Sequence, residues 1–455
     1  MVANLIGKER TCAREILRAH GMTPMRQILT PELFGQAYPC HPTPKTILSP
    51  EVVFWLMAHV ALGAGSMAGS MAHFWSSLRA LLPWLPAVAV QEEAFCSARR
   101  RLSLRFFLQL FFLVVRGYRQ AGLERRWKGL RLLGTDGMEN DLPRHPHLRR
   151  LFPPAANQYG SRGAPQARLV GLVGLHDGIC YDFRWTNLRV SEQASVRRLL
   201  PQLGPHDLLL ADRNFPDKAT FAGILAQEAD FLFHLPQNRF RQLARTPTAS
   251  GRRDEWLCRI PLPPELQKQY PQLPLEITVR ILEYQRPGFR TSWLITALLD
   301  TQSFTYAELV ELYHQRWRQE TFHREWKYSL DLSNLRSHRG TGLLKEVLVQ
   351  LTLNNVIRWI MRQAAGPTLL PVQLKFLQAK RLILAAIPAM TVAPTCCLPG
   401  LYRQLLAEIA RQRIWLRPGR SYPRKWDARG RPKGHGKVTA PAKLPLLKEN
   451  SYAPI

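Results

Sequence analysis

Two aspartates stand at positions where α/β proteins usually place their chemistry. Asp136 and Asp212 each follow a short apolar run, LLGT and LLLA respectively. Each is therefore predicted at the carboxyl end of a buried strand, the edge where open α/β sheets bind ligands. Two carboxylates on neighbouring strands repel each other unless a divalent cation lies between them. The pair favours a metal site, although either aspartate taken alone fits the start of a turn equally well.

A long predicted helix supplies a third carboxylate. At about 100° per residue, four of its side chains lie within a stripe roughly 60° wide, and these are Tyr313, Arg316, Glu320 and Lys327. A carboxylate flanked by two cations and a phenol suits a scissile phosphate, and a surface ladder of ion pairs is the alternative. Glu325 is rotated by about 140° from Glu320 and lies off this stripe. Glu325→Gln is therefore expected to cost little cleavage activity.

Several other kinds of site have no support in the sequence. There is no G-x-x-x-x-G-K-[ST] loop, no G-x-S-x-G and no H-E-x-x-H, which argues against an ATPase, a serine hydrolase and a zinc protease. The cysteines form an odd set without a C-x-x-C pair, which predicts reduced thiols in a cytosolic protein. They are Cys12, Cys40, Cys96, Cys180, Cys258, Cys396 and Cys397.

The composition predicts a globular protein with a polyanionic partner. The 455 residues are 46% hydrophobic, enough for a large core divided into two to four structural units. Lys and Arg number 63 against 33 Asp and Glu, a formal charge of +30. Nucleic acid is the favoured partner because phosphate neutralisation dominates its affinity for proteins, with anionic lipid as the alternative. The apolar stretch 52–75 is broken by glycines, which favours buried helices over a membrane span.

The elements that must position these residues follow an ordered plan. Residues 1–127 show helical periodicity and predict an all-helical N-terminal DNA-binding domain, with helices over 51–62, 67–82, 91–102 and 104–121. Arg99, Arg100 and Arg101 leave the end of the third helix together. They suit phosphate or base contacts by a helix-turn-helix-like element, with a solvated basic face as the alternative.

From residue 128 onward the pattern becomes α/β. Residues 128–237 alternate short apolar runs with helices and predict a mixed sheet with a tight turn at Asp177-Gly178; the runs are 130–137, 168–175, 179–186, 207–212 and 230–235. Residues 238–301 predict a β-rich insertion. Residues 302–410 predict helices, over 305–330, 341–364 and on to about 412. Residues 411–455 are basic and predict a disordered arm that contacts phosphates.

Four segments carry a resemblance to a known family. The segment 313–327, YHQRWRQETFHREWK, resembles the Y-x2-R-x3-E-x6-K signature of the DDE transposases of the insertion-sequence-four family. The GTDG segment around Asp136 and the ADRNF segment that begins at residue 211 resemble the two Asp motifs of that family, in the expected order. SARRRL, residues 97–102, resembles part of the N-terminal domain of such enzymes. The similarity extends over about residues 45–430.

The resemblance implies a fold, a chemistry and partners. The implied fold is ribonuclease-H-like, with a mixed sheet, flanking helices and a β-rich insertion before the helix of Glu320. Asp136, Asp212 and Glu320 would be the catalytic residues and would hold two Mg2+ or Mn2+ ions. Tyr313, Arg316 and Lys327 would bind DNA phosphates near the cut.

The implied enzyme cuts the ends of its insertion sequence and transfers the 3′-hydroxyl ends to target DNA. Its partners would be the terminal inverted repeats and target DNA, bound by a homodimer. No membrane is expected, and the implied location is the bacterial cytoplasm at the nucleoid.

Two other functions remain open at this point. One is a transposase-derived DNA-binding protein that has lost catalysis, which the intact set of three carboxylates disfavours. The other is a ribonuclease-H-like nuclease without strand transfer. Terminal inverted repeats beside the gene would argue against the second.

Overall fold

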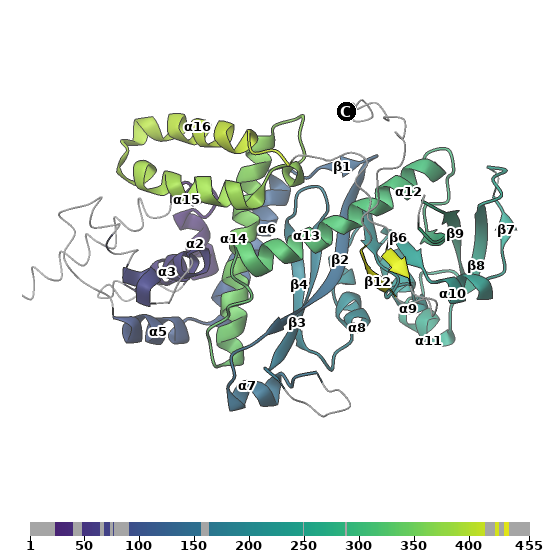
Figure 1. Cartoon of the computed structure of the whole chain (residues 1–455), viewed down its shortest axis with the longest axis horizontal. Helices are drawn as coiled ribbons and strands as arrows, with labels where there is room; N and C mark the ends of the chain where they lie inside the picture. The colour runs from purple at the N-terminus through teal and green to yellow at the C-terminus, as the bar shows by residue number, and fades with distance from the viewer. Residues whose placement is uncertain are drawn as a thin grey trace, which may run out of the picture. The chain divides into compact units, whose positions relative to one another are not determined.

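The structure is a computed structural model that divides into two compact units (Figure 1). It describes residues 23–39, 48–63, 68–72, 76, 91–155, 163–248, 250–286, 289–414, 424–426 and 432–435. Unit 1 contains the described residues of Met1–Gln202, Trp317–Gly366 and Leu370–Gln412, and unit 2 contains those of Leu203–Arg316, Pro367–Leu369 and Arg413–Ile455.

The N-terminal part of unit 1 is helical, as the sequence predicted. The side chains of Thr30, Ser49 and Ser103 each accept a hydrogen bond from a backbone N–H three residues on, which caps the helix that follows. Three of the four predicted helices are present, and most of the one predicted over 67–82 lies outside the described residues. The helices are α2 (Pro31–Ala37), α3 (Pro50–Leu62), α5 (Glu92–Arg101) and α6 (Leu104–Gln120).

The sheet of unit 1 is an antiparallel meander. Gly178 has a φ of +75° in the turn between the last two strands, a conformation that glycine adopts without strain, so the Asp177-Gly178 turn is confirmed. The strand predicted over 130–137 runs on to Asp141. The strands are β1 (Arg126–Trp127), β2 (Leu130–Asp141), β3 (Gln166–Gly174) and β4 (Cys180–Asn187), and α7 (Pro146–Leu151) and α8 (Glu192–Arg197) lie next to them in the chain.

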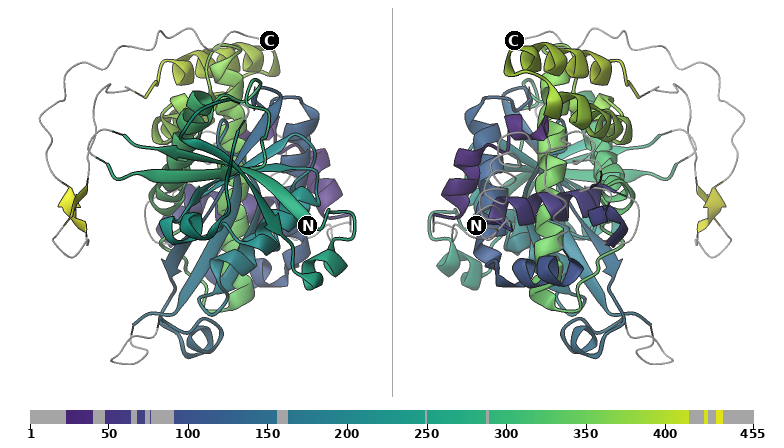
Figure 2. Two further views of the ribbon diagram at one scale, coloured as in Figure 1. Left: turned by 90° about the vertical axis from the view of Figure 1, so that its right-hand side faces the viewer. Right: turned by 90° about the vertical axis from the view of Figure 1, so that its left-hand side faces the viewer.

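One long helix, α14 (Gly340–Ala365), organises unit 1. It packs against α3, α6, α15 (Phe376–Val392) and α16 (Leu398–Ala410), and the right-hand view of Figure 2 shows it among these helices. Its Asn355 exchanges two hydrogen bonds of 2.8 Å with the backbone of Cys180. Asn354 donates to the carbonyl of Gly178 at 3.0 Å. The helix therefore fastens the β3–β4 turn.

Unit 2 contains a mixed sheet. Strands β5 (Asp207–Ala211) and β6 (Asp230–Leu235) are parallel and are joined by α9 (Lys218–Leu225). The sheet continues on the other side of β6 in antiparallel fashion through β10, β9, β8 and β7. Their bounds are Ser292–Thr296, Glu276–Tyr284, Glu255–Pro261 and Thr246–Pro247, and the helices α10 (Gln237–Gln242), α11 (Pro264–Gln269) and α12 (Tyr306–His314) complete the unit.

The expected fold class is confirmed. Ten strands and their flanking helices form a mixed α/β, ribonuclease-H-like fold with a β-rich insertion and a helical N-terminal part. The insertion, predicted as a separate block, continues the sheet of β5 and β6 because β10 pairs with β6 along four residues.

The tail and the apolar segments add three observations. Within 411–455, β11 (Arg424–Trp426) and β12 (Pro432–His435) pair antiparallel, whereas most of this predicted disordered arm lies outside the described residues. No helix in the described ranges is long and apolar enough to cross a membrane. The five cysteines in the described ranges are free thiols, and Cys12 and Cys40 lie outside them.

A buried ion pair holds the insertion in place. Arg280 on β9 donates to Glu255 on β8, and both side chains are fully buried. Ser250 donates to Glu255 at 2.9 Å, and Arg280 also donates to the carbonyl of Phe304 at 2.6 Å. The pair therefore joins the two strands to the loop that precedes α12.

We predict that Glu255→Gln lowers the free energy of unfolding by about 3–5 kcal/mol, because it leaves the buried Arg280 charge without a counter-ion. Urea unfolding of the full chain, followed by tryptophan fluorescence, measures the change. Asp254→Asn is the matched control, because it breaks the exposed pair with Arg252 and should cost less than about 1 kcal/mol. Equal losses in the two variants would contradict the prediction.

Candidate active site

Asp136 faces the helical segment that carries Glu320. In the β2–β3 ladder, Asp136 lies opposite Gly171, and directly opposed residues of an antiparallel pair project on the same side of a sheet. A Cβ built on Gly171 would lie 3.0 Å from the ring of Trp326, and one on Gly134 would lie 3.0 Å from Gln319 Oε1. Because Gly134 and Asp136 are two residues apart on β2, their side-chain directions share one face.

Glu320 lies on α13 (Arg318–Arg324), which packs on that face of β2. Gln319 is fully buried against the strand, whereas Glu320, one residue later, is exposed. Asp136 is half-buried, and its Oδ1 accepts a hydrogen bond of 2.9 Å from the backbone N–H of Gly137. Unit 1 therefore places the elements of two predicted catalytic carboxylates against each other.

The regular helix predicted over 305–330 is wrong in detail. The α-helices α12 and α13 are separated by a 3-10 turn, η3 (Gln315–Trp317), and α13 runs into a π-helical turn, η4 (Glu325–Ser329). Because 3-10 turns are tighter and π turns wider than an α-helix, a constant 100° per residue does not describe the whole segment. The predicted 60° stripe that begins at Tyr313 therefore does not extend to Lys327, which is half-buried in the π turn.

Glu325 has a structural partner. Its carboxylate pairs with Arg358 of α14, whose side chain is 1% exposed. Burial raises the pKa of Glu325, and the neighbouring Arg358 opposes this rise. Glu325→Gln is therefore expected to cost stability, because a buried guanidinium would lose its counter-ion.

Unit 2 carries the remaining predicted residues of the site. Asp212 follows β5, is half-buried, and accepts a hydrogen bond of 2.9 Å from the backbone N–H of Asn214. The parallel register pairs Ala211 with Phe233, so Asp212 and His234 lie at the same level of the β5–β6 pair. The rings of His234 and Tyr313 are 6.2 Å apart.

The environment of Asp212 sets the ionisation of its neighbours. Burial raises the pKa of Tyr313, with Asp212 adding to the rise. Burial also lowers the pKa of His234, with Arg213 and Arg316 adding to the fall. At neutral pH these two side chains are therefore an uncharged phenol and an uncharged imidazole.

Arg316 completes this group, with its guanidinium 6.0 Å from the centre of the Tyr313 ring. His234 was missed by the sequence reading because it lies inside an apolar run, and only the strand register reveals its place beside Asp212. Its Nδ1 is buried without a hydrogen-bond partner among the described residues. In the described part of the chain, no group of three or more His, Cys, Asp or Glu side chains forms a metal site.

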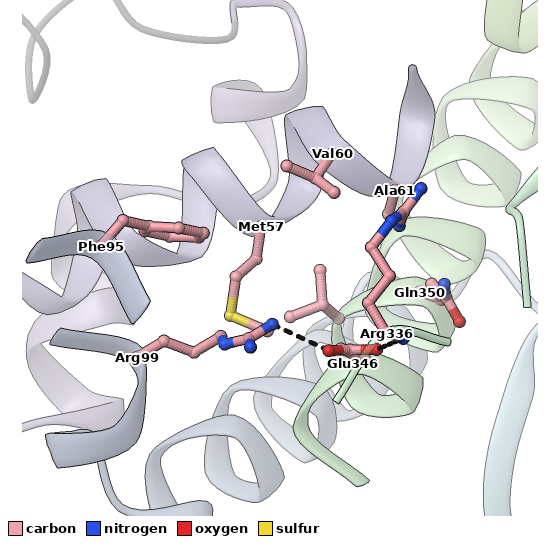
Figure 3. A pocket seen from close by; sticks show the side chains of 9 residues that line it. Met57, Val60, Ala61, Phe95, Arg99, Arg336, Glu346 and Gln350 are labelled. Carbon is pink, nitrogen blue, oxygen red and sulfur yellow. Dashed lines mark hydrogen bonds and ion pairs between the residues drawn. The ribbon is translucent and has the colours of Figure 1, made fainter. Parts of the chain in front are cut away.

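The three arginines of α5 do not act as one group. Arg99 forms an ion pair of 2.8 Å with Glu346, and the two side chains are 14% and 11% exposed (Figure 3). Arg100 and Arg101 are exposed and hydrogen-bond within their own helix. A role in DNA contact stays a prediction for the exposed pair, whereas Arg99 joins α5 to α14.

Comparisons with known proteins concern the family of the chain. The family described as "Transposase DDE domain" matches residues 141–355, a range that includes Asp212 and Glu320 and begins after Asp136. The "Transposase InsG for insertion sequence element IS4" of Escherichia coli (strain K12) is 25% identical over 340 residues, which cover 74% of this chain and 76% of the relative. The cryo-EM structure of the piggyBac transposase synaptic complex with hairpin DNA is similar with a TM-score of 0.44 at 10% identity, covering 87% of this chain and 86% of that one.

The Y-x2-R-x3-E-x6-K segment resembles the same family that the domain match and the relative indicate, and the relative covers about three quarters of the chain. These findings support a DDE transposase of the IS4 type.

Proposed function

We propose that this transposase cuts the ends of its insertion sequence and joins the freed 3′-hydroxyl ends to target DNA. One observation carries the proposal: within unit 1, the strand of Asp136 and the helix of Glu320 pack against each other with Asp136 facing that helix. The three carboxylates suit metal binding, and this favours a catalytic role over a purely DNA-binding role.

The proposed metal ligands are Asp136, Asp212 and Glu320. The donors are carboxylate oxygens, the hard ligands that suit Mg2+ and Mn2+, and all three side chains are at least partly exposed. When bound, two such ions would activate the attacking oxygen and stabilise the leaving oxygen. The set therefore fits the divalent ions that the family implies.

The side chains around Asp212 are proposed to hold the DNA phosphate. Arg316 offers a guanidinium with several N–H donors. Tyr313 keeps its proton because its pKa is raised, so it can donate an O–H to a phosphate oxygen. Lys327 would add a further positive charge. Coupled cutting of the two element ends leads us to propose a homodimer on DNA.

Two glutamates on one helical segment provide the sharpest test of the site. We predict that Glu320→Gln lowers strand cleavage by orders of magnitude without changing the melting temperature, because an exposed metal ligand loses its charge. Glu325→Gln should lower the melting temperature, because buried Arg358 loses its counter-ion, while the folded protein still cuts. Both variants are compared in Mg2+ at equal DNA occupancy. A dead Glu325→Gln enzyme beside an active Glu320→Gln enzyme would refute the assignment.

Replacing Asp136 or Asp212 by Asn should abolish cleavage of an element-end duplex and leave DNA binding nearly intact, because metal ligation and phosphate binding use different groups. Gel-based cleavage and fluorescence anisotropy measure the two properties separately. Asp207→Asn is the control, since Asp207 lies at the opposite end of β5 from Asp212. Measurable cutting by the Asp212→Asn variant in Mg2+ would remove Asp212 from the catalytic set.

The arginines of α5 allow a matched comparison of DNA contact with packing. We predict that replacing Arg100 and Arg101 by Ala weakens binding of element-end DNA without changing the melting temperature. Arg99→Ala should instead lower the melting temperature, because Glu346 is left partly buried without its partner. Anisotropy and thermal unfolding on both variants decide the matter. Unchanged DNA affinity in the double variant would assign these arginines to a solvated surface.

A further inference from the structure

Three surface segments of unit 1 are rich in basic residues and contain no Asp or Glu. They are the end of α5 with the start of α6, 97–105, the loop before α14 with the first turn of that helix, 332–344, and α7 with the turn before it, 142–151. The exposed basic side chains of these segments are Arg100, Arg101, Arg105, Arg144, Arg149, Arg150, His338 and Arg339.

The first two segments meet at the start of α14. Buried Lys345 donates from Nζ to the carbonyls of Arg99 at 3.0 Å and Arg100 at 3.3 Å, at the C-terminal end of α5. Glu346 pairs with Arg99 and accepts a hydrogen bond of 2.7 Å from the backbone N–H of Arg336 (Figure 3). Lys345 and Glu346, two successive residues of α14, therefore hold both the end of α5 and the loop before α14.

The loop in turn contacts the third segment. The rings of His145 and His338 stack 5.0 Å apart with an interplanar angle of 13°. A Cβ on Gly340 would lie 3.2 Å from Leu151 Cδ1 at the end of α7. The start of α14 lies between α5 and α7 (Figure 1), so the three segments form one continuous surface, which we call the α5–α7 basic surface.

We propose that the α5–α7 basic surface binds the sugar-phosphate backbone of the element-end duplex beside the cut. Duplex DNA carries one negative charge per about 1.7 Å of its axis, so an extended row of exposed arginines complements it. His145 Nδ1 accepts a hydrogen bond from the N–H of His147 at 3.2 Å, so a neutral His145 ring carries its proton on Nε2 and can donate it to a phosphate.

The element end is the DNA that fits this surface best, and this step depends on the proposed function. The surface belongs to the same unit as Asp136 and Glu320. The 142–151 segment follows β2 directly, and β2 carries Asp136 five residues before its end at Asp141. Phosphates held at α7 are thus kept at a fixed distance from a catalytic carboxylate, which is what cutting at one defined bond requires.

The test is the salt dependence of binding to a fluorescent duplex that contains the inverted repeat beside the gene and its flanking DNA. Replacing Arg144, Arg149 and Arg150 together by Ala should reduce the log–log slope by about 2.7, because each lost phosphate contact removes roughly 0.9. The matched control removes three exposed arginines from α6, α15 and α16, Arg116, Arg381 and Arg403, and should leave the slope unchanged. Replacing Arg144, Arg149 and Arg150 by Lys keeps the charges and should restore most of the slope.

Three results would overturn the proposal. An unchanged slope in the Ala variant, or an equal loss in the control variant, would mean that α7 makes no phosphate contacts of its own. Loss of target joining from pre-cut ends, with the end-duplex slope intact, would assign the surface to target DNA. Cleavage by the unaltered protein in Mg2+ tests the proposed function separately, so failure of one does not imply failure of the other.

Discussion

The close approach of a helical segment to two strands is the constraint on which unit 1 depends. At Gly134 a Cβ would lie 3.0 Å from Gln319 Oε1 of α13, and at Gly171 it would lie 3.0 Å from the Trp326 ring. Larger residues at these two positions would push α13 and η4 away from the sheet, and Glu320 would move with them. The glycines therefore set the separation between the strand of Asp136 and the helix of Glu320.

A second set of contacts fixes the same segment from the side of α14. Trp326 donates to Asn354 at 3.1 Å, and Asn354 donates to the carbonyl of Gly178 in the β3–β4 turn. Glu325 meets Arg358 on the same helix. The π turn that contains Glu325 and Trp326 is thus held by partners about 30 residues away, and such partners can override local helix geometry. For this reason helical periodicity predicted the segment but not its 3-10 and π turns.

Local patterns predicted much of the site, and long-range partners decided the rest. Apolar runs that end in Asp136 and Asp212 predicted the strands, and the spacing around Glu320 gave the family signature. His234 lies beside Asp212 only because β5 and β6 are parallel in one particular register. The separation of Arg99 from Arg100 and Arg101 depends on Glu346, which lies 247 residues along the chain from Arg99. A single sequence contains no signal for the β5–β6 register or for the pairing of Arg99 with Glu346.

The formal charge of +30 overstates the charge that is available to DNA, because several arginines are buried in ion pairs. Among the described residues, five arginines are largely buried in ion pairs with glutamates: Arg26, Arg99, Arg131, Arg280 and Arg358. Their charges are neutralised locally, and their removal would weaken the fold before it weakened binding. Among the arginines that remain exposed in unit 1, Arg100 and Arg101 lie on α5, whose end is attached to the start of α14 through Lys345 and Glu346. Because the same helix holds the β3–β4 turn and Glu325, a shift of α14 would move the proposed DNA-binding surface and the Glu320 segment together. Unit 1 thus combines the proposed DNA-binding residues of α5 and two of the three proposed catalytic carboxylates in one compact unit.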